Sequence, residues 1–139
     1  MSLRWSRRRF MLLMSGFLFS GFKRFGGESD SGTALEIVLS DYPELSMDGG
    51  YKVIKDVMID GIEDNLIIVR QSEKNYVVLS SICRHKKCNV KFRNSKQLFV
   101  CPCHGSNYDL EGSVVKGPSS GPLPKYKVEV NETILKITR

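Results

Sequence analysis

The chain has 139 residues, enough for one domain of ordinary size with a short appendage but too few for two full domains. Its apolar fraction of 41% and charged fraction of 26% exclude a collagen-like or disordered protein. Six of the basic residues behind the net charge of +6 precede residue 25, and no basic helix follows, so no nucleic-acid partner is expected.

The first 25 residues have the order of an export signal. Residues 1–9 (MSLRWSRRR) are positive, and residues 10–22 (FMLLMSGFLFSGF) carry no charge. The run SRRRFM, with Arg7 and Arg8 paired, resembles a twin-arginine signal, which implies export of a folded protein. We expect residues 1–25 to be a twin-arginine-like signal or an uncleaved membrane anchor. Residues 26–33 (GGESDSGT) have the composition of a flexible linker.

Residues 34–139 are predicted to form an all-β domain. Short runs rich in Val, Ile, Leu and Tyr alternate with clusters of Gly, Pro, Asn and Asp, as strands and turns require. The segment IDGIEDN at 59–65 is one such turn, and no helical period occurs there. The eight predicted strands cover residues 35–39, 51–55, 66–70, 75–79, 97–100, 113–115, 125–130 and 133–137.

All cysteines and histidines lie in two segments that flank the predicted strand at 97–100. The segment CRHKKC spans 83–88, and CPCHGS spans 101–106. A hairpin about the strand would bring one Cys and one His from each segment together. Two thiolates and two imidazoles fit a structural zinc ion, and they also fit a two-iron, two-sulfide cluster with the cysteines on one iron and the histidines on the other. The six candidate residues are Cys83, His85, Cys88, Cys101, Cys103 and His104.

The motifs C-x-H-x-x-C and C-P-C-H-G-S closely resemble those of the Rieske iron–sulfur proteins. The similarity covers residues 34–139 and includes GPLP at 121–124, which is similar to a proline-containing loop of the family. The resemblance implies a Rieske-type domain of stacked antiparallel sheets that holds one 2Fe–2S cluster. The ligands it implies are Cys83 and Cys101 on one iron and His85 and His104 on the other.

The resemblance further implies a disulfide between Cys88 and Cys103. Rieske ferredoxins and the Rieske domains of oxygenases, which work in the reducing cytoplasm, generally lack this cysteine pair. A disulfide requires an oxidising compartment. The pair therefore agrees with the export signal, and we expect a membrane-anchored domain on the periplasmic side.

The resemblance also implies electron transfer at a high potential. Ser106 and Tyr108 match family positions whose hydroxyls bond a bridging sulfide and a cysteine sulfur, and such bonds favour the upper part of the range of about −150 to +300 mV. We expect an electron-transfer subunit, and no catalyst by itself, that takes electrons from quinol in a cytochrome bc-type complex. Its partners would be the membrane, a b-type cytochrome and a c-type cytochrome. Alternatives are a stand-alone periplasmic carrier, the small subunit of an exported oxidoreductase such as arsenite oxidase, and a zinc-binding module.

The first segment departs from the quinol-oxidising pattern at two positions. Those family members usually have Leu-Gly between the first histidine and the second cysteine, where this chain has Lys86-Lys87. Residues 84–96 contain six basic and no acidic residues. Such a run is either a solvated basic face or a docking surface for an acidic redox partner.

Overall fold

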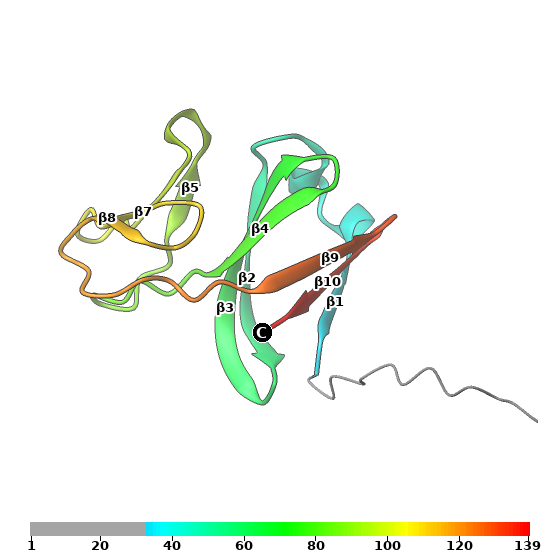
Figure 1. Cartoon of the computed structure of the whole chain (residues 1–139), viewed down its shortest axis with the longest axis horizontal. Coiled ribbons are helices and arrows are strands. Elements are labelled where there is room, and N and C mark those ends of the chain that lie inside the picture. The colour runs from blue at the N-terminus through cyan, green and yellow to red at the C-terminus, as the bar shows by residue number, and fades with distance from the viewer. Residues whose placement is uncertain (1–32) are drawn as a thin grey trace, which may run out of the picture. The chain divides into compact units, whose positions relative to one another are not determined.

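The computed structural model describes residues 33–139, which form an all-β domain (Figure 1). All strand pairs in it are antiparallel, and the other regular elements are short 3-10 turns, so the predicted all-β fold is confirmed. The predicted signal or anchor at 1–25, and the linker apart from residue 33, lie outside the described residues. Within residues 33–139 no helix is long and apolar enough to cross a membrane.

Three sheets build the domain. The central sheet has the order β2 (Tyr51–Ile59), β3 (Ile62–Ser72), β4 (Asn75–Ser80). The second has the order β1 (Leu35–Val38), β10 (Ile134–Thr138), β9 (Lys127–Asn131). The third, at the left of Figure 1, has the order β5 (Lys91–Arg93), β6 (Leu98–Val100), β7 (Asn107–Tyr108), β8 (Val114–Lys116). The 3-10 turns are η1 (Leu39–Asp41), η2 (Pro43–Ser46) and η3 (Asn94–Lys96).

The central strand β3 is buried on both faces, which explains its continuous apolar run LIIV at 66–69. Successive side chains of a strand point to opposite faces. Leu66 and Ile68 therefore pack in one core with residues of the second sheet, and Ile67 and Val69 pack in another core with residues of the third sheet. The central sheet thus serves as a common wall for two cores, of which the second contains the predicted site.

Two features of the strands differ from the sequence prediction. The predicted turn at 59–65 consists only of Asp60 and Gly61, whose φ angles of 52° and 72° are those of a tight two-residue hairpin. The strands β2 and β3 therefore continue to the ends of this hairpin. Strands β5 and β7 have three and two residues, too few to show an alternation in the sequence, and they form because they pair with β6.

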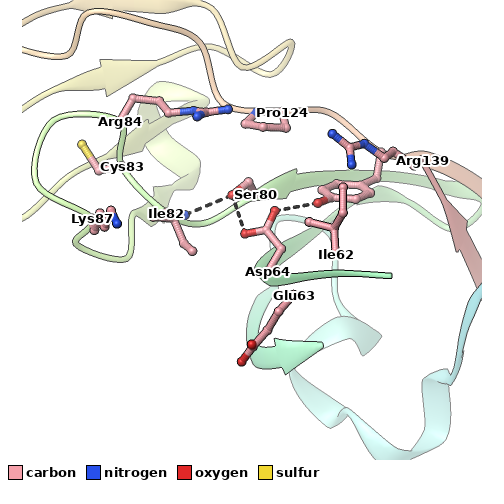
Figure 2. Close-up of a pocket in the computed structure, with 11 residues that line it drawn as sticks. Ile62, Glu63, Asp64, Ser80, Ile82, Cys83, Arg84, Lys87, Pro124 and Arg139 are labelled. Atoms are coloured by element: carbon pink, nitrogen blue, oxygen red, sulfur yellow. Dashed lines mark hydrogen bonds between the residues drawn. The ribbon is translucent and has the colours of Figure 1, made fainter. Parts of the chain in front are cut away.

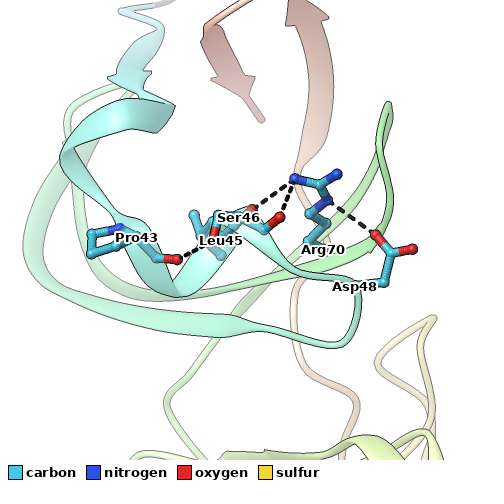
Figure 3. Close-up of polar contacts among 5 residues, drawn as sticks. All are labelled: Pro43, Leu45, Ser46, Asp48 and Arg70. Atoms are coloured by element: carbon cyan, nitrogen blue, oxygen red, sulfur yellow. Dashed lines mark hydrogen bonds and ion pairs between the residues drawn. The ribbon is translucent and has the colours of Figure 1, made fainter.

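Arg70 of β3 fixes the connection between β1 and β2 (Figure 3). Its guanidinium donates hydrogen bonds to the carbonyl oxygens of Leu45 (3.2 Å) and Ser46 (2.9 Å), and its Nε forms an ion pair with Asp48 (3.1 Å). Carbonyls at the end of a short helical turn have no partner within the turn. Arg70 supplies that partner and ties the connection to the central sheet.

The segment after the third sheet carries the chain back along β4 to the second sheet. The Ser80 N–H donates to the carbonyl of Pro124 (2.8 Å), and the Tyr126 N–H donates to the carbonyl of Val78 (2.9 Å). The Tyr126 hydroxyl then donates to Asp64 Oδ2 on β3 (2.5 Å). One tyrosine therefore joins the returning chain to two strands of the central sheet.

Candidate metal centre

Two loops bring the predicted ligands together, and they share one pattern of backbone hydrogen bonds. The first loop is residues 82–90, and the second is residues 101–106. The Cys83 N–H donates to the carbonyl five residues on (2.8 Å), and its carbonyl accepts from the N–H four residues on, that of Lys87 (2.9 Å). Cys101 has the same two bonds, at 2.8 and 3.0 Å, the second of them from Gly105. Lys87 and Gly105 close the two turns with φ angles of 58° and 75°.

The four predicted ligands differ in burial. Cys83 and Cys101 are 0% and 2% exposed and belong to the core of the third sheet. His85 and His104 are exposed, and their ring centroids lie 4.7 Å apart. The site therefore consists of an inner pair of sulfurs and an outer pair of imidazoles.

This arrangement fits a two-metal centre better than a single zinc ion. The four donor atoms around one tetrahedral zinc ion lie about 3.5 Å from one another. In the part of the chain that the structure describes, the only three donor atoms all within 4.8 Å of one another belong to Cys88, Cys101 and Cys103, and two of these form a disulfide. The inner and outer pairs instead match the separate cysteine and histidine sides of a Rieske-type cluster.

The disulfide predicted between Cys88 and Cys103 is present. It joins the first loop to the second across a sequence separation of 15 residues. Its sulfurs lie within 4.8 Å of the Cys101 sulfur. The bond therefore holds the two loops, and with them the two pairs of predicted ligands, in a fixed relation next to the site.

Two buried hydroxyl groups lie at the inner side of the site. Tyr108 Oη lies 3.1 Å from Cys83 Sγ, within hydrogen-bonding distance of sulfur. Ser106 is 0% exposed, and its oxygen accepts a hydrogen bond from the Ser119 N–H (3.0 Å). Because the oxygen is the acceptor in that bond, the hydroxyl proton is not used by it. Ser119 was not predicted from the sequence, because it follows a proline within a segment without a metal-binding motif.

The two cysteine thiols have opposite pKa shifts. Burial raises the pKa of Cys83, but hydrogen bonds from the Tyr108 hydroxyl, the His85 N–H and the Cys101 thiol outweigh it, so the net pKa lies below the ordinary value of 9.0. Burial also raises the pKa of Cys101, and the neighbouring Cys83 adds to that increase. Opposite shifts are the response expected of two acidic groups held close together.

An asparagine pair that the sequence did not reveal anchors the first loop to the central sheet. Asn65 Nδ2 donates to Asn89 Oδ1 (3.2 Å), and the Ser81 hydroxyl donates to the same oxygen (2.8 Å). Asn65 Oδ1 in turn accepts from the N–H of Asp56, which lies in a β-bulge of β2 with φ 54°. The bulge and the loop are distant in sequence, so only pairing of β2 with β3 brings them together.

A pocket of about 300 Å³ adjoins the first loop (Figure 2). Arg84 and Lys87 line it from the loop, and Asp64 lines it from β3. The Asp64 carboxylate already accepts hydrogen bonds from the hydroxyls of Ser80 (2.8 Å) and Tyr126 (2.5 Å). The pocket is therefore lined by charges of both signs, with Arg84, Lys87 and Arg139 positive and Glu63 and Asp64 negative.

The family can be assigned on this geometry together with the sequence match. The sequence model of the family described as the Rieske [2Fe-2S] domain matches residues 46–127. This match covers more than half of the chain and includes both loops. The chain therefore belongs to the Rieske [2Fe-2S] domain family. Its cofactor is one 2Fe–2S cluster, and its work is electron transfer.

Among individual proteins, the chain is similar to cytochrome b6-f complex iron-sulfur subunits. It is 30% identical to that of Synechococcus elongatus over 145 residues, covering 91% of this chain and 79% of the relative. It is 33% identical to that of Chlorobaculum tepidum over 69 residues, but this match covers only 38% of the relative.

Solved structures show the same fold. The plasma membrane Rieske protein of Synechocystis PCC 6803 is 27% identical, with a TM-score of 0.50 over 55% of this chain and 78% of that one. The ferredoxin of carbazole 1,9a-dioxygenase from Nocardioides aromaticivorans IC177 is 21% identical, with a TM-score of 0.60 over 76% and 97% of the two chains. The second likeness concerns the fold alone.

Proposed function

We propose that Cys83 and Cys101 bind one iron of the cluster and that His85 and His104 bind the other. The observation that carries this assignment is the exposed pair of imidazoles above a buried pair of sulfurs. When bound, the cluster supplies a one-electron acceptor and donor. The buried cysteines exclude water from its inner side, and the histidines form its contact with the outside.

We propose further that the domain takes electrons from quinol in a cytochrome bc-type complex and passes them to a c-type cytochrome. Quinol oxidation releases protons as well as electrons. An exposed imidazole can hold a proton on the ring nitrogen that faces away from a metal. His85 and His104, exposed side by side, can therefore receive a proton at the place where a donor makes contact.

The hydroxyls of Tyr108 and Ser106 support a high reduction potential. Hydrogen bonds to cluster sulfur stabilise an added electron. Tyr108 is placed to donate to the Cys83 sulfur, and the Ser119 N–H orients the Ser106 hydroxyl from behind. A high potential suits an acceptor of quinol electrons.

The disulfide supports an extracytoplasmic location. Such bonds persist in oxidising compartments, and the Cys88–Cys103 bond joins the two loops of the site. Together with the predicted signal at 1–25, it supports a periplasmic location of the domain of residues 34–139, on a membrane to which the chain is anchored. The similarity to cytochrome b6-f complex subunits supports a membrane complex with b-type and c-type cytochromes.

A second candidate is a free-standing exported electron carrier. Lys86 and Lys87 favour it, because they place charge where the quinol-oxidising members of the family usually have Leu-Gly. Both lysines are exposed at the tip of the first loop. A charged tip is less suited than an apolar one to enter a membrane-embedded quinol pocket.

Purification of the native membrane complex through this subunit tests the proposal. Copurification of a b-type cytochrome is expected. Copurification of a molybdenum subunit would contradict the quinol role and would favour the small subunit of an exported oxidoreductase such as arsenite oxidase. Recovery of the chain alone would favour the free carrier. EPR of the reduced protein tests the ligands, since mixed Cys and His ligation gives an average g below the free-electron value. A colourless, EPR-silent protein would contradict the cluster.

A further inference from the structure

We propose that six basic residues beside the metal centre form a docking surface for an acidic redox protein. This surface, called the basic ridge, comprises Arg84, Lys86, Lys87, Lys91, Arg93 and Lys96. The inference rests on the electron transfer proposed for the centre, but it does not require quinol as the donor. It names the chemistry of the partner, a protein that presents carboxylates around its own redox group.

Positive charge in the domain is concentrated in the basic ridge. Residues 34–139 contain 15 basic and 13 acidic residues. Without the six residues of the ridge, nine basic and 13 acidic residues remain, a net charge of −4. No Asp or Glu occurs between residues 74 and 108, the stretch that contains both loops. The side of the domain that carries the metal centre is therefore positive, and the rest of the domain has a net negative charge. This asymmetry orients an approaching acidic partner.

The charges of the ridge are not neutralised within the described part of the chain. All six side chains are exposed. The three ion pairs of residues 33–139 use Lys52, Arg70 and Lys125 instead. Charges that already had internal partners would offer little to another protein, so the absence of such partners favours an external one.

Four residues of the ridge line pockets beside the two loops of the centre, and Lys96 lies farther along the chain, in η3 after β5. Arg84 and Lys87 line the pocket of about 300 Å³ next to the first loop (Figure 2). Lys91 and Arg93, on either side of buried Phe92, line a second pocket of about 370 Å³ that includes Pro102 of the second loop. The second pocket offers two positive side chains and no acidic one to a carboxylate of a partner, whereas Glu63 and Asp64 also line the first.

Lys87 indicates that charge at this place matters more than local stability. Its φ of 58° lies in the left-handed region, which glycine adopts without strain and other residues do not. Gly105 occupies the equivalent position of the second loop with a φ of 75°. A strained, charged residue at an exposed tip is more readily explained by recognition than by folding.

An acidic protein fits the ridge better than an acidic lipid surface. Lys86 flanks His85, and the second pocket adjoins the loop that carries His104. Electrons cross to a partner most rapidly where the two redox groups approach most closely, which is at these imidazoles. Lipid headgroups held by the same ridge would cover the imidazoles and keep a redox partner away.

The test uses the full chain with its cluster in neutral detergent, and one acidic and one basic c-type cytochrome as probes. Binding is measured by surface plasmon resonance over a range of ionic strength. Contacts are mapped with a carbodiimide, which joins a lysine amine directly to a carboxylate. The double variant Lys91→Glu/Arg93→Glu tests the ridge. Its matched control is Lys55→Glu/Lys127→Glu, which reverses two exposed charges on β2 and β9.

We expect added salt to weaken binding of the acidic cytochrome, and the ridge variant to weaken it about tenfold. The control variant should change it by less than about twofold. Cross-links should involve the lysines of the ridge. Lys86→Glu is a second variant that leaves β5 intact, in case the double variant fails to fold.

The inference would be overturned by binding that salt does not affect, by equal losses in the ridge and control variants, or by cross-links confined to other lysines. Cosedimentation with vesicles containing phosphatidylglycerol adds a further comparison. If the ridge variants lose binding to the vesicles but not to the acidic cytochrome, the ridge faces a membrane and the inference is wrong. These binding results do not depend on quinol, so failure of the proposed quinol role is recognised separately, from the subunits that copurify.

Discussion

Tyr108 shows how a single hydroxyl can adjust the electron affinity of the proposed centre. Its oxygen lies 3.1 Å from the Cys83 sulfur inside the core. We expect Tyr108→Phe to lower the reduction potential by roughly 20–65 mV, the equivalent of one hydrogen bond of about 0.5–1.5 kcal/mol. A reductive titration followed by visible absorbance measures this change. Tyr76→Phe, at a buried tyrosine in the core of the second sheet, is the matched control and should leave the potential unchanged.

Ser106 allows the same test on the other hydroxyl. Its oxygen accepts the Ser119 N–H, which leaves its proton free to stabilise a reduced cluster. We expect Ser106→Ala to lower the potential by a similar amount, again measured by reductive titration. Unchanged potentials in both the serine and the tyrosine variants would refute the roles given to the two hydroxyls.

Lys87 combines a strained backbone with an exposed charge. A residue other than glycine in the left-handed region costs roughly 1–2 kcal/mol, and glycine at this position would remove that cost. We therefore expect Lys87→Gly to raise the melting temperature by several degrees, measured as the loss of the visible absorbance on heating. Lys86→Gly is the control, because Lys86 has no positive φ to relieve and glycine should gain nothing there. A lower melting temperature in Lys87→Gly would argue against strain at this position.

The two loops are elements that depend on each other, since neither carries a complete set of ligands. The Cys88–Cys103 disulfide closes a separation of 15 residues between them. A crosslink over a loop of about this length stabilises a fold by about 3 kcal/mol. We expect the double variant Cys88→Ser/Cys103→Ser to lose its cluster much faster in urea, followed as bleaching of the visible absorbance. Reductant should bring the wild type toward the rate of the variant but should leave the variant unaffected, and equal initial rates would contradict a stabilising bond.

At the scale of the whole domain, Tyr126 connects the chain that returns from the third sheet to strands β3 and β4 of the central sheet. Burial, and then its hydrogen bond to Asp64, raise the pKa of Tyr126 above the ordinary value of 10.0. Above that value the tyrosine loses its proton in the unfolded chain but keeps it in the folded one. Stability should therefore fall as the pH rises above about 10, because the unfolded state then binds fewer protons.

Urea unfolding at a series of alkaline pH values measures this effect. Tyr126→Phe should be less stable at neutral pH, because Asp64 loses a donor, and its stability should depend less on pH above 10. Tyr42→Phe, at a half-buried tyrosine, should keep the slope of the wild type. Equal slopes in the wild type and Tyr126→Phe would assign the alkaline sensitivity to other groups.

Much of the site was predictable because its chemistry is encoded in short motifs. The spacing in CRHKKC and CPCHGS indicated the candidate ligands, and the resemblance that these motifs carry implied the cluster and the disulfide. The all-β fold followed from the alternation of apolar runs and turn residues. Strand lengths were less predictable, because polar residues at 63–65 continue β3 through pairing that no local pattern shows.

The motifs predicted which residues would carry the chemistry, since ligand type and spacing are local properties of the chain. The tertiary structure alone decided their depth: the cysteines lie in the core and the histidines at the surface because the third sheet packs against the central sheet. The tertiary structure also brings residues from distant segments into hydrogen bonds that support the loops. Ser119 bonds Ser106, and Asn65 bonds Asn89. Such contacts join residues far apart in sequence, and only the packing of the sheets brings them within hydrogen-bonding distance.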